Sequence, residues 1–204
     1  MIEQTKIKNI LFDLGGVILN IDYLLTINEF NKLGVKNSEE IFSQFKQASF
    51  ANDFETGKIT ENEFYQEIIK VSGVNFDFFQ FKKAWNAMLL DLPERRIFLL
   101  KKLAEKYRLF LFSNTNQTHY KQFITLVESD FNTIFEKTYY SHTFGKRKPD
   151  PDSFFTILNE NGLKPNETLF VDDSIQHIAS AIKIGISTLH LTESDVLTEF
   201  KEWV

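Results

Sequence analysis

Short, continuous apolar runs constrain the fold of this chain more than any other feature of its sequence. Four or five such runs, each beside a segment of helical periodicity, lie at residues 7–12, 109–112, 137–140, 168–171 and 186–191. A strand covered by helices on both faces is apolar at nearly every position, whereas a strand with one solvated face alternates. The pattern therefore predicts an α/β fold with a doubly wound, mainly parallel, Rossmann-like sheet.

Helix-capping residues delimit the segments between these runs. Pro93 can open one helix, and Asp150 with Pro151 suits the N-cap and first turn of another, which Gly162 ends. Ser174 can cap a third helix. Strands that alternate with capped helices are typical of an open α/β sheet.

The region from residue 22 to 91 has helical periodicity only. Asn37 with Glu40 and Thr60 with Glu63 fit the capping box. Large apolar residues recur there at helical spacing, which predicts a packed core; they are Phe42, Phe45, Phe64, Ile68, Phe78, Phe81 and Trp85. We expect residues 1–21 and 92–204 to form an α/β catalytic core, and residues 22–91 to form an inserted all-helical cap domain over the strand ends.

The composition indicates in which compartment the protein works and which classes of partner it binds. The 204 residues include no cysteine, which excludes disulfides, thiolate metal sites and a cysteine nucleophile and suits a reducing cytoplasm. A net charge of −5 without a basic run argues against nucleic acid. No window approaches the roughly 18 apolar residues that a membrane span needs. The sequence therefore predicts a cytoplasmic protein with neither a nucleic-acid nor a membrane partner.

Polar residues follow four of the predicted strands. Asp13 follows the first and Ser113 ends the second, Lys148 lies after the third, and Asp172 and Asp173 end the fourth. Taken singly, Asp13 and Ser113 are usually turn or helix-capping residues and Lys148 a solvated surface lysine, while Asp172 with Asp173 suits a cap and a metal site equally well. Ligands of a doubly wound sheet bind at the carboxyl ends of its strands, so together the four ends predict one site.

These residue types suit phosphoryl transfer. A carboxylate such as Asp13 can attack phosphorus and form an aspartyl-phosphate. Ser113, with neighbouring backbone N–H groups, can hold the phosphoryl oxygens, and Lys148 can neutralise the developing charge. Asp172 and Asp173 offer the hard oxygen ligands that Mg²⁺ prefers.

On these motifs the sequence resembles the haloacid dehalogenase-like hydrolase superfamily, whose members are mostly Mg²⁺-dependent phosphatases. The segments 13–17, 113–116 and 147–149 are similar to a bacterial subgroup that includes sugar-1-phosphate phosphatases. The segment Glu55 to Thr60 is similar to a cap segment of that subgroup, and its residues Glu55 to Ile59 either contribute a specificity loop or form a plain connection between two helices. The resemblance implies that the partner is a small phosphorylated metabolite.

The resemblance also implies a ligand set for Mg²⁺. Asp13, the backbone carbonyl of Gly15 and Asp173 would bind the ion directly, and Asp172 would act through water. The reaction would use Asp13 as nucleophile.

Two further residues follow Ser113 in the second motif. Asn114 is expected to bind phosphate beside Ser113 and Lys148, and His119 either contacts substrate or orients the Ser113 loop, unless it only caps a helix or lies at the surface. The other histidines show no spacing typical of metal ligands and are expected to be structural; they are His142, His177 and His190.

Gly15 departs from the superfamily pattern, in which most phosphatases have a general acid–base Asp at this position. Such catalysis contributes about 10²–10⁴-fold. A phosphatase could take the proton from Asp22, His119 or water, and a sugar 1-phosphate would need it least because an anomeric hydroxyl is relatively acidic. The alternatives are a non-catalytic phosphometabolite-binding module and a metal-independent haloacid dehalogenase. The adjacent Asp172 and Asp173 favour phosphoryl chemistry over the dehalogenase.

Overall fold

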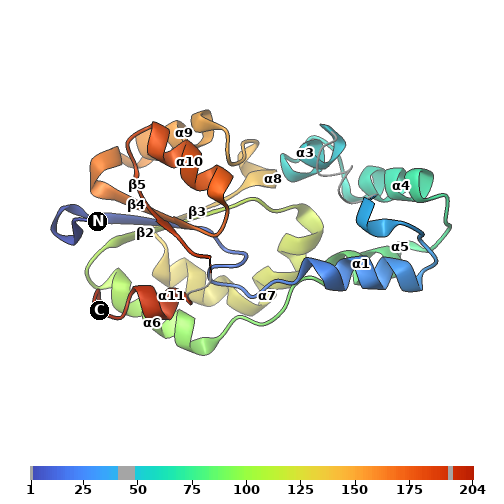
Figure 1. Ribbon diagram of the computed structural model, residues 1–204, viewed down its shortest axis with the longest axis horizontal. Coiled ribbons are helices and arrows are strands. Elements are labelled where there is room, and N and C mark those ends of the chain that lie inside the picture. The colour runs from blue at the N-terminus through green and yellow to red at the C-terminus, as the bar shows by residue number, and fades with distance from the viewer. Residues whose placement is uncertain (1, 41–48, 193–194) are drawn as a thin grey trace.

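A five-stranded sheet forms the centre of the protein, in a computed structural model that describes residues 2–40, 49–192 and 195–204 (Figure 1). Its strands are β1 (Asn9–Phe12), β2 (Arg108–Ser113), β3 (Lys137–Tyr140), β4 (Thr168–Asp172) and β5 (Ser187–His190). They are ordered β3-β2-β1-β4-β5, and every neighbouring pair is parallel. The predicted doubly wound parallel sheet is confirmed.

The strand order places a topological switch point between β1 and β4. The chain builds β2 and β3 on one side of β1 and then crosses to build β4 and β5 on the other. The two strands are in register, with Phe12 opposite Val171, and the Asp13 N–H donates to the Val171 carbonyl at 2.9 Å. Ligands of such sheets bind at this point.

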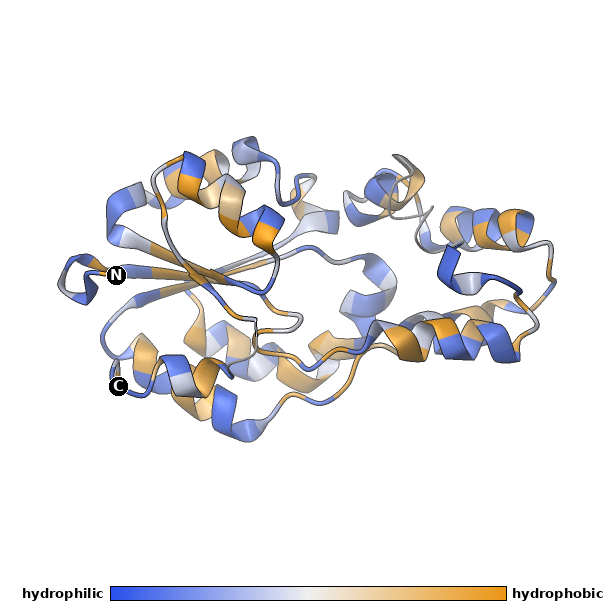
Figure 2. Ribbon diagram, viewed as in Figure 1, coloured by the Kyte–Doolittle hydropathy of each residue, from blue (hydrophilic) through white to orange (hydrophobic). Residues whose placement is uncertain are grey.

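Helices cover both faces of the sheet (Figure 1). On one face lie α6 (Glu94–Ala104), α7 (Gln117–Ile134) and α11 (Val196–Glu199), and on the other lie α9 (Pro151–Asn161) and α10 (Ile175–Lys183). Along β1, Ile10 and Phe12 pack into the first layer and Leu11 into the second. Figure 2 shows the flanking helices with both hydrophobic and hydrophilic bands, which suits helices with one covered face.

The shorter elements and helix ends follow the capping signals, with one correction. Short helices η1 (Gln4–Lys6), α8 (Ser141–Phe144) and η2 (Pro165–Glu167) complete the core. Pro93 precedes α6, the Asp150 carboxylate caps α9, and Gly162 ends α9 in a left-handed conformation. Ser174 occupies the N-cap position of α10, but its side chain makes no capping bond; its backbone N–H instead donates to Asp172 at 2.7 Å.

The described helices between β1 and α6 form a separate body at the right of Figure 1. They are α1 (Tyr23–Lys32), α3 (Ser49–Glu55), α4 (Glu61–Ser72) and α5 (Phe78–Asn86). They enclose their own core, which includes Phe30, Phe54, Phe64, Ile68, Phe76 and Phe81 with Phe78 and Trp85 at its edge. Phe42 and Phe45, which we expected in this core, lie outside the described residues. The proposed domain boundaries remain a prediction.

The capping box of Thr60 and Glu63 is confirmed. The Glu63 N–H donates to the Thr60 hydroxyl at 3.2 Å, and the Thr60 N–H donates to the Glu63 carboxylate at 2.7 Å. At the other expected box, Asn37 has a φ of 56° instead of the extended backbone of an N-cap. Asn tolerates this left-handed conformation better than most residues.

Two connections that lie side by side join the helical body to the sheet. Asn20 exchanges backbone hydrogen bonds with Asp91 and Leu90, and the Asp22 N–H donates to the Met88 carbonyl at 2.9 Å. This short antiparallel ribbon holds the helical body beside the carboxyl ends of the strands. Among the described helices, none has the length and apolar character of a membrane span.

Candidate active site

A completely buried lysine forms the centre of the site. The Lys148 ammonium lies 2.7 Å from the Asp13 carboxylate and 2.6 Å from that of Asp172, so it links the ends of β1 and β4. The rings of Phe112 and Phe170 lie 5.3 and 5.4 Å from the ammonium. Burial lowers the pKa of Lys148, but the two carboxylates raise it by more and keep this side chain charged.

The two carboxylates that share this ammonium differ in their environment. Burial raises the pKa of Asp13 to about 7, and the nearby Asp172 adds to the shift against the opposing effect of Lys148. Burial also acts on Asp172, but Lys148 and His177 outweigh it and lower its pKa to about 2. Asp172 is therefore the ionised partner of Lys148, and Asp13 is the carboxylate that a further cation would favour in its charged form.

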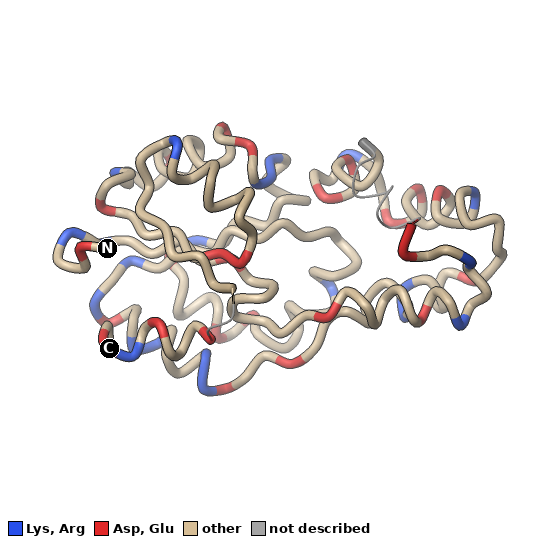
Figure 3. The backbone as a smooth tube through the Cα atoms, viewed as in Figure 1, with Lys and Arg blue, Asp and Glu red and all other residues tan. Residues whose placement is uncertain are grey.

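Three carboxylates gather at this point. Oxygen atoms of Asp13, Asp172 and Asp173 all lie within 4.8 Å of one another. Figure 3 shows acidic residues where β4 ends and α10 begins. Burial and the neighbouring Asp172 raise the pKa of Asp173. When all three carboxylates are ionised, they and the ammonium of Lys148 carry a formal charge of 3 × (−1) + 1 = −2, which a divalent cation would balance.

The three carboxylates are not equally available to a cation. Asp172 is fully buried and already accepts hydrogen bonds from Lys148, the Ser174 N–H and His177. Asp13 and Asp173 instead line a cavity of about 340 Å³ at the strand ends. This set of hard oxygen donors fits Mg²⁺, with Asp13 and Asp173 better placed for direct contact than Asp172.

Two glycines after Asp13 shape this cavity. Gly16 has a φ of 78°, and a Cβ there would lie 2.2 Å from a carboxylate oxygen of Asp173. Any side chain at Gly16 would therefore displace Asp173. At Gly15, a Cβ would lie 3.3 Å from the end of the Ile21 side chain. Ile21 covers the position at which most phosphatases of the superfamily carry their general acid–base Asp.

The residues expected to bind phosphate have different surroundings. Ser113 is buried at the end of β2 and lines the same cavity as Asp13. The Asn114 side chain accepts from the Lys148 N–H at 2.9 Å and donates to the Lys148 carbonyl at 2.8 Å. Asn114 thus holds the backbone of the lysine that bridges the two carboxylates.

His119 is held as a neutral ring. The Asn116 carbonyl oxygen accepts from the His119 backbone, so its amide nitrogen faces His119 Nδ1 at 3.1 Å and donates to it. Nε2–H then donates to the Trp85 carbonyl at 3.0 Å, and the His119 and Trp85 rings stack at 5.3 Å. Burial lowers the pKa of His119 to about 4. Both ring nitrogens are engaged, so His119 orients the loop after β2 against α5 and has no nitrogen left for proton transfer.

Two further residues make contacts that the sequence did not specify. The Asp22 carboxylate, proposed as a possible proton donor, accepts the Leu24 N–H at 2.9 Å and caps α1. His177, expected to be structural, donates from Nδ1 to Asp172 at 3.0 Å and lines the cavity. Its position in the first turn of the helix after β4 was the sequence signal for this contact.

A second cavity of about 160 Å³ adjoins the first and lies under the helical body. Both cavities are lined by Tyr23, Met88, Asn114, Thr115 and His119. Phe54, Phe64 and Trp85 add an aromatic wall to the second cavity. Sequence reasoning missed this contribution because the same residues follow the pattern of a helical core.

Comparisons with known proteins agree with this arrangement. Residues 10–191 match the family described as haloacid dehalogenase-like hydrolase. A D-ribitol-5-phosphate phosphatase of Bacteroides thetaiotaomicron is 30% identical over 89% of this chain and 90% of that protein.

Two solved structures share the fold over almost their whole length. An enzyme of the family from B. thetaiotaomicron, in complex with magnesium and inorganic phosphate, has 37% identity and a TM-score of 0.85 and covers 95% of this chain and 99% of its own. A family hydrolase from Porphyromonas gingivalis has 30% identity and a TM-score of 0.86 and covers 97% of this chain and 98% of its own. The protein described here thus belongs to the haloacid dehalogenase-like hydrolases.

Proposed function

We propose that this protein is a Mg²⁺-dependent phosphatase that hydrolyses a small sugar or polyol phosphate through an aspartyl-phosphate on Asp13. The observation that supports this most directly is the buried Lys148 between Asp13 and Asp172, beside the exposed carboxylate of Asp173. A nucleophile, a fixed cation and further carboxylates at one cavity are what phosphoryl transfer requires.

Asp13, the Gly15 carbonyl and Asp173 would hold Mg²⁺, with Asp172 acting through water. When bound, the ion would neutralise phosphate oxygens and align the phosphoryl group with Asp13. The formal charge of −2 in the acidic cluster supports this assignment.

The first chemical step is carried by Asp13. Its carboxylate oxygen forms a bond to phosphorus while the ester P–O bond breaks and the alcohol oxygen leaves with the bonding electrons. The Ser113 hydroxyl donates to a phosphoryl oxygen. Lys148, 2.7 Å from Asp13, keeps this carboxylate paired with a cation and oriented. In the second step, water attacks phosphorus, phosphate leaves and the Asp13 carboxylate is regenerated.

Gly15 has no side chain that could donate a proton to the leaving oxygen. His119 is already hydrogen bonded at both nitrogens, and Asp22 caps α1. We therefore favour water as the proton source. A sugar 1-phosphate suits this arrangement because its anomeric oxygen leaves more readily than an ordinary alkoxide. The D-ribitol-5-phosphate phosphatase among the relatives makes polyol phosphates the second group to test.

Release of inorganic phosphate tests the proposal. The wild type, Asp13→Asn and the control Asp130→Asn, which changes a half-exposed carboxylate paired with Lys101 on α6, are compared with Mg²⁺ and with EDTA. The substrates are glucose 1-phosphate, glucose 6-phosphate and ribitol 5-phosphate. We expect release that requires Mg²⁺, is lost in Asp13→Asn and is kept in Asp130→Asn, with the 1-phosphate preferred. Binding of these esters without release would instead identify a phosphometabolite-binding module.

A further inference from the structure

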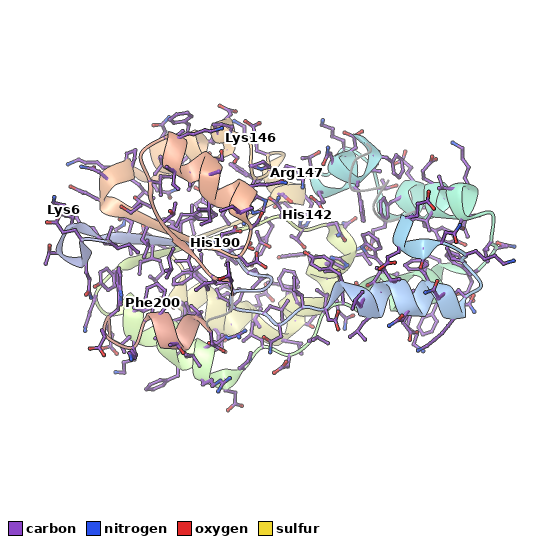
Figure 4. All side chains as sticks on the ribbon, in the orientation of Figure 1. Lys6, His142, Lys146, Arg147, His190 and Phe200 are labelled. Carbon is purple, nitrogen blue, oxygen red and sulfur yellow. The ribbon has the colours of Figure 1, made fainter. Side chains whose placement is uncertain are left out.

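An ion pair joins the helical body to the loop that carries Lys148. The Arg147 guanidinium lies 2.9 Å from the Glu55 carboxylate at the end of α3 and also donates to the Asn52 side chain. Figure 4 shows Arg147 and His142 at the side of the core that faces α3. Arg147 directly precedes Lys148, so this pair fixes Glu55 relative to the phosphoryl site.

The backbone next to Glu55 also contacts the core closely. Gly57 has a φ of 71°, and a Cβ there would lie 2.0 Å from the His142 carbonyl oxygen on α8. This approach is possible only without a side chain. The segment after α3 therefore lies directly on the core, and Glu55 is positioned by contacts on both of its sides.

Glu55 also lines the second cavity, which shares Tyr23 with the cavity that Asp13 lines. Most polar side chains of that cavity bond to their own neighbours. Thr26 bonds to the Trp85 carbonyl, Asn114 to the Lys148 backbone, and Asn116 and His119 to each other. With His119 neutral, Glu55 is the one charged side chain among the described lining residues.

The Glu55–Arg147 ion pair suits a ligand that carries hydroxyl groups. A carboxylate can accept about four hydrogen bonds, so it can pair with an arginine and accept from ligand hydroxyls at the same time. Hydroxyls that donate to a carboxylate form charge-assisted bonds, and the wall of Phe54, Phe64 and Trp85 can cover the C–H faces of a carbohydrate chain.

Two other substrate classes fit less well. An apolar ester would bury the Glu55 carboxylate without giving it a hydrogen bond. A cationic group would suit an aromatic pocket that contains a carboxylate, but the Arg147 guanidinium at 2.9 Å neutralises Glu55 and repels a cation.

We propose that Glu55 selects hydroxylated phosphate esters, of the sugar or polyol class, by accepting hydrogen bonds from their hydroxyls, and that Arg147 is the positioning residue that holds the Glu55 carboxylate. This inference rests on the proposed phosphatase function and names the group in the second cavity that recognises the alcohol part of the substrate.

The test compares kcat/KM for ribitol 5-phosphate, phenyl phosphate and phosphocholine in the wild type, Glu55→Leu, Glu55→Gln and Arg147→Met. Glu61→Leu is the matched control, because Glu61 pairs with Lys121 and Thr118 across the same boundary but does not line the cavity. We expect Glu55→Leu to lower kcat/KM for ribitol 5-phosphate about 10- to 100-fold and to change that for phenyl phosphate less than about threefold, with partial recovery in Glu55→Gln.

The Arg147→Met variant tests whether Arg147 positions the Glu55 carboxylate or only packs against it. Without the guanidinium, Glu55 keeps its negative charge, so hydrolysis of phosphocholine should rise while that of ribitol 5-phosphate falls. Equal losses on all three esters in Glu55→Leu, or the same selectivity loss in Glu61→Leu, would overturn the inference.

Binding by calorimetry in the Asp13→Asn background separates this inference from the proposed activity. If the wild type hydrolyses no ester, the phosphatase proposal fails. A selective loss of ribitol 5-phosphate binding in Asp13→Asn/Glu55→Leu would still support Glu55 as the recognition residue, and unchanged binding would overturn it.

Discussion

Acidification should destabilise this protein through His119, whose neutral form is built into the junction between α7 and α5. The ring accepts from Asn116 and donates to the Trp85 carbonyl, so a second ring proton would face the Asn116 amide nitrogen, which is also a donor. Burial lowers the pKa of His119 to about 4 in the folded protein, against an ordinary value of 6.5.

The sign and size of the effect follow from these two pKa values. Between pH 6.5 and pH 4, the unfolded chain binds a proton at His119 and the folded chain does not, so stability falls as the pH falls. At pH 5.0 the His119 contribution amounts to about 2 kcal/mol of lost stability relative to pH 7.5. The ring is almost completely buried, so solvent screening reduces this figure little.

Urea unfolding followed by tryptophan fluorescence measures this contribution. The free energy of unfolding is determined at pH 7.5 and pH 5.0 for the wild type and for His119→Gln, which can still donate to the Trp85 carbonyl. Titration of carboxylates affects both proteins alike and cancels in the difference. We expect the wild type to lose about 2 kcal/mol more than His119→Gln between the two pH values. Equal losses in the two proteins would refute the buried neutral histidine.

Three further substitutions test the geometry of the site. Gly16→Ala should weaken Mg²⁺ binding by at least tenfold in calorimetry, because its Cβ would displace the Asp173 carboxylate, and unchanged affinity would contradict that contact. Lys148→Met leaves two buried carboxylates without their shared cation, so the free energy of unfolding in EDTA should fall by about 3–5 kcal/mol, and a loss below about 1 kcal/mol would show that the ion pair is not as described. Gly57→Ala should lower kcat/KM for phosphate esters clearly while the melting temperature falls little, because moving the helical body away from the core relieves the clash with the His142 carbonyl. Unchanged kcat/KM would argue against that close approach.

The sheet and its strand ends are predictable because their sequence signals are local. The three central strands β1, β2 and β4 are buried along almost their whole length and read as apolar runs, and Asp13, Ser113 and Asp172 lie within one residue of their ends. Parallel strands bring their carboxyl ends to one edge, so residues far apart in sequence could be assigned to one site without further information. The likeness to a known family added the ligand roles that spacing alone left open.

The contribution of the helical body is not predictable in this way. Trp85 and Phe54 have the periodicity of core residues and also line the second cavity, so their pattern does not reveal that second role. Arg147 contacts Asn52 across 95 positions of sequence, and only the packing of α3 against the core brings them together. The covering of Gly15 by Ile21 also depends on how the connection to α1 folds back, which no local motif encodes.

Direct capture of a phosphoryl group on Asp13 is the most direct test of the proposed phosphatase reaction. The protein is mixed with ribitol 5-phosphate or glucose 1-phosphate and Mg²⁺, quenched in acid within milliseconds to seconds and reduced with borohydride, which converts an aspartyl-phosphate to homoserine. Because Gly15 offers no side chain to assist the attack of water, the intermediate should accumulate. We predict homoserine at position 13 by peptide mass spectrometry, dependent on substrate and Mg²⁺ and absent in Asp13→Asn. Phosphate release without any modification at Asp13, or with modification at another residue, would contradict the account.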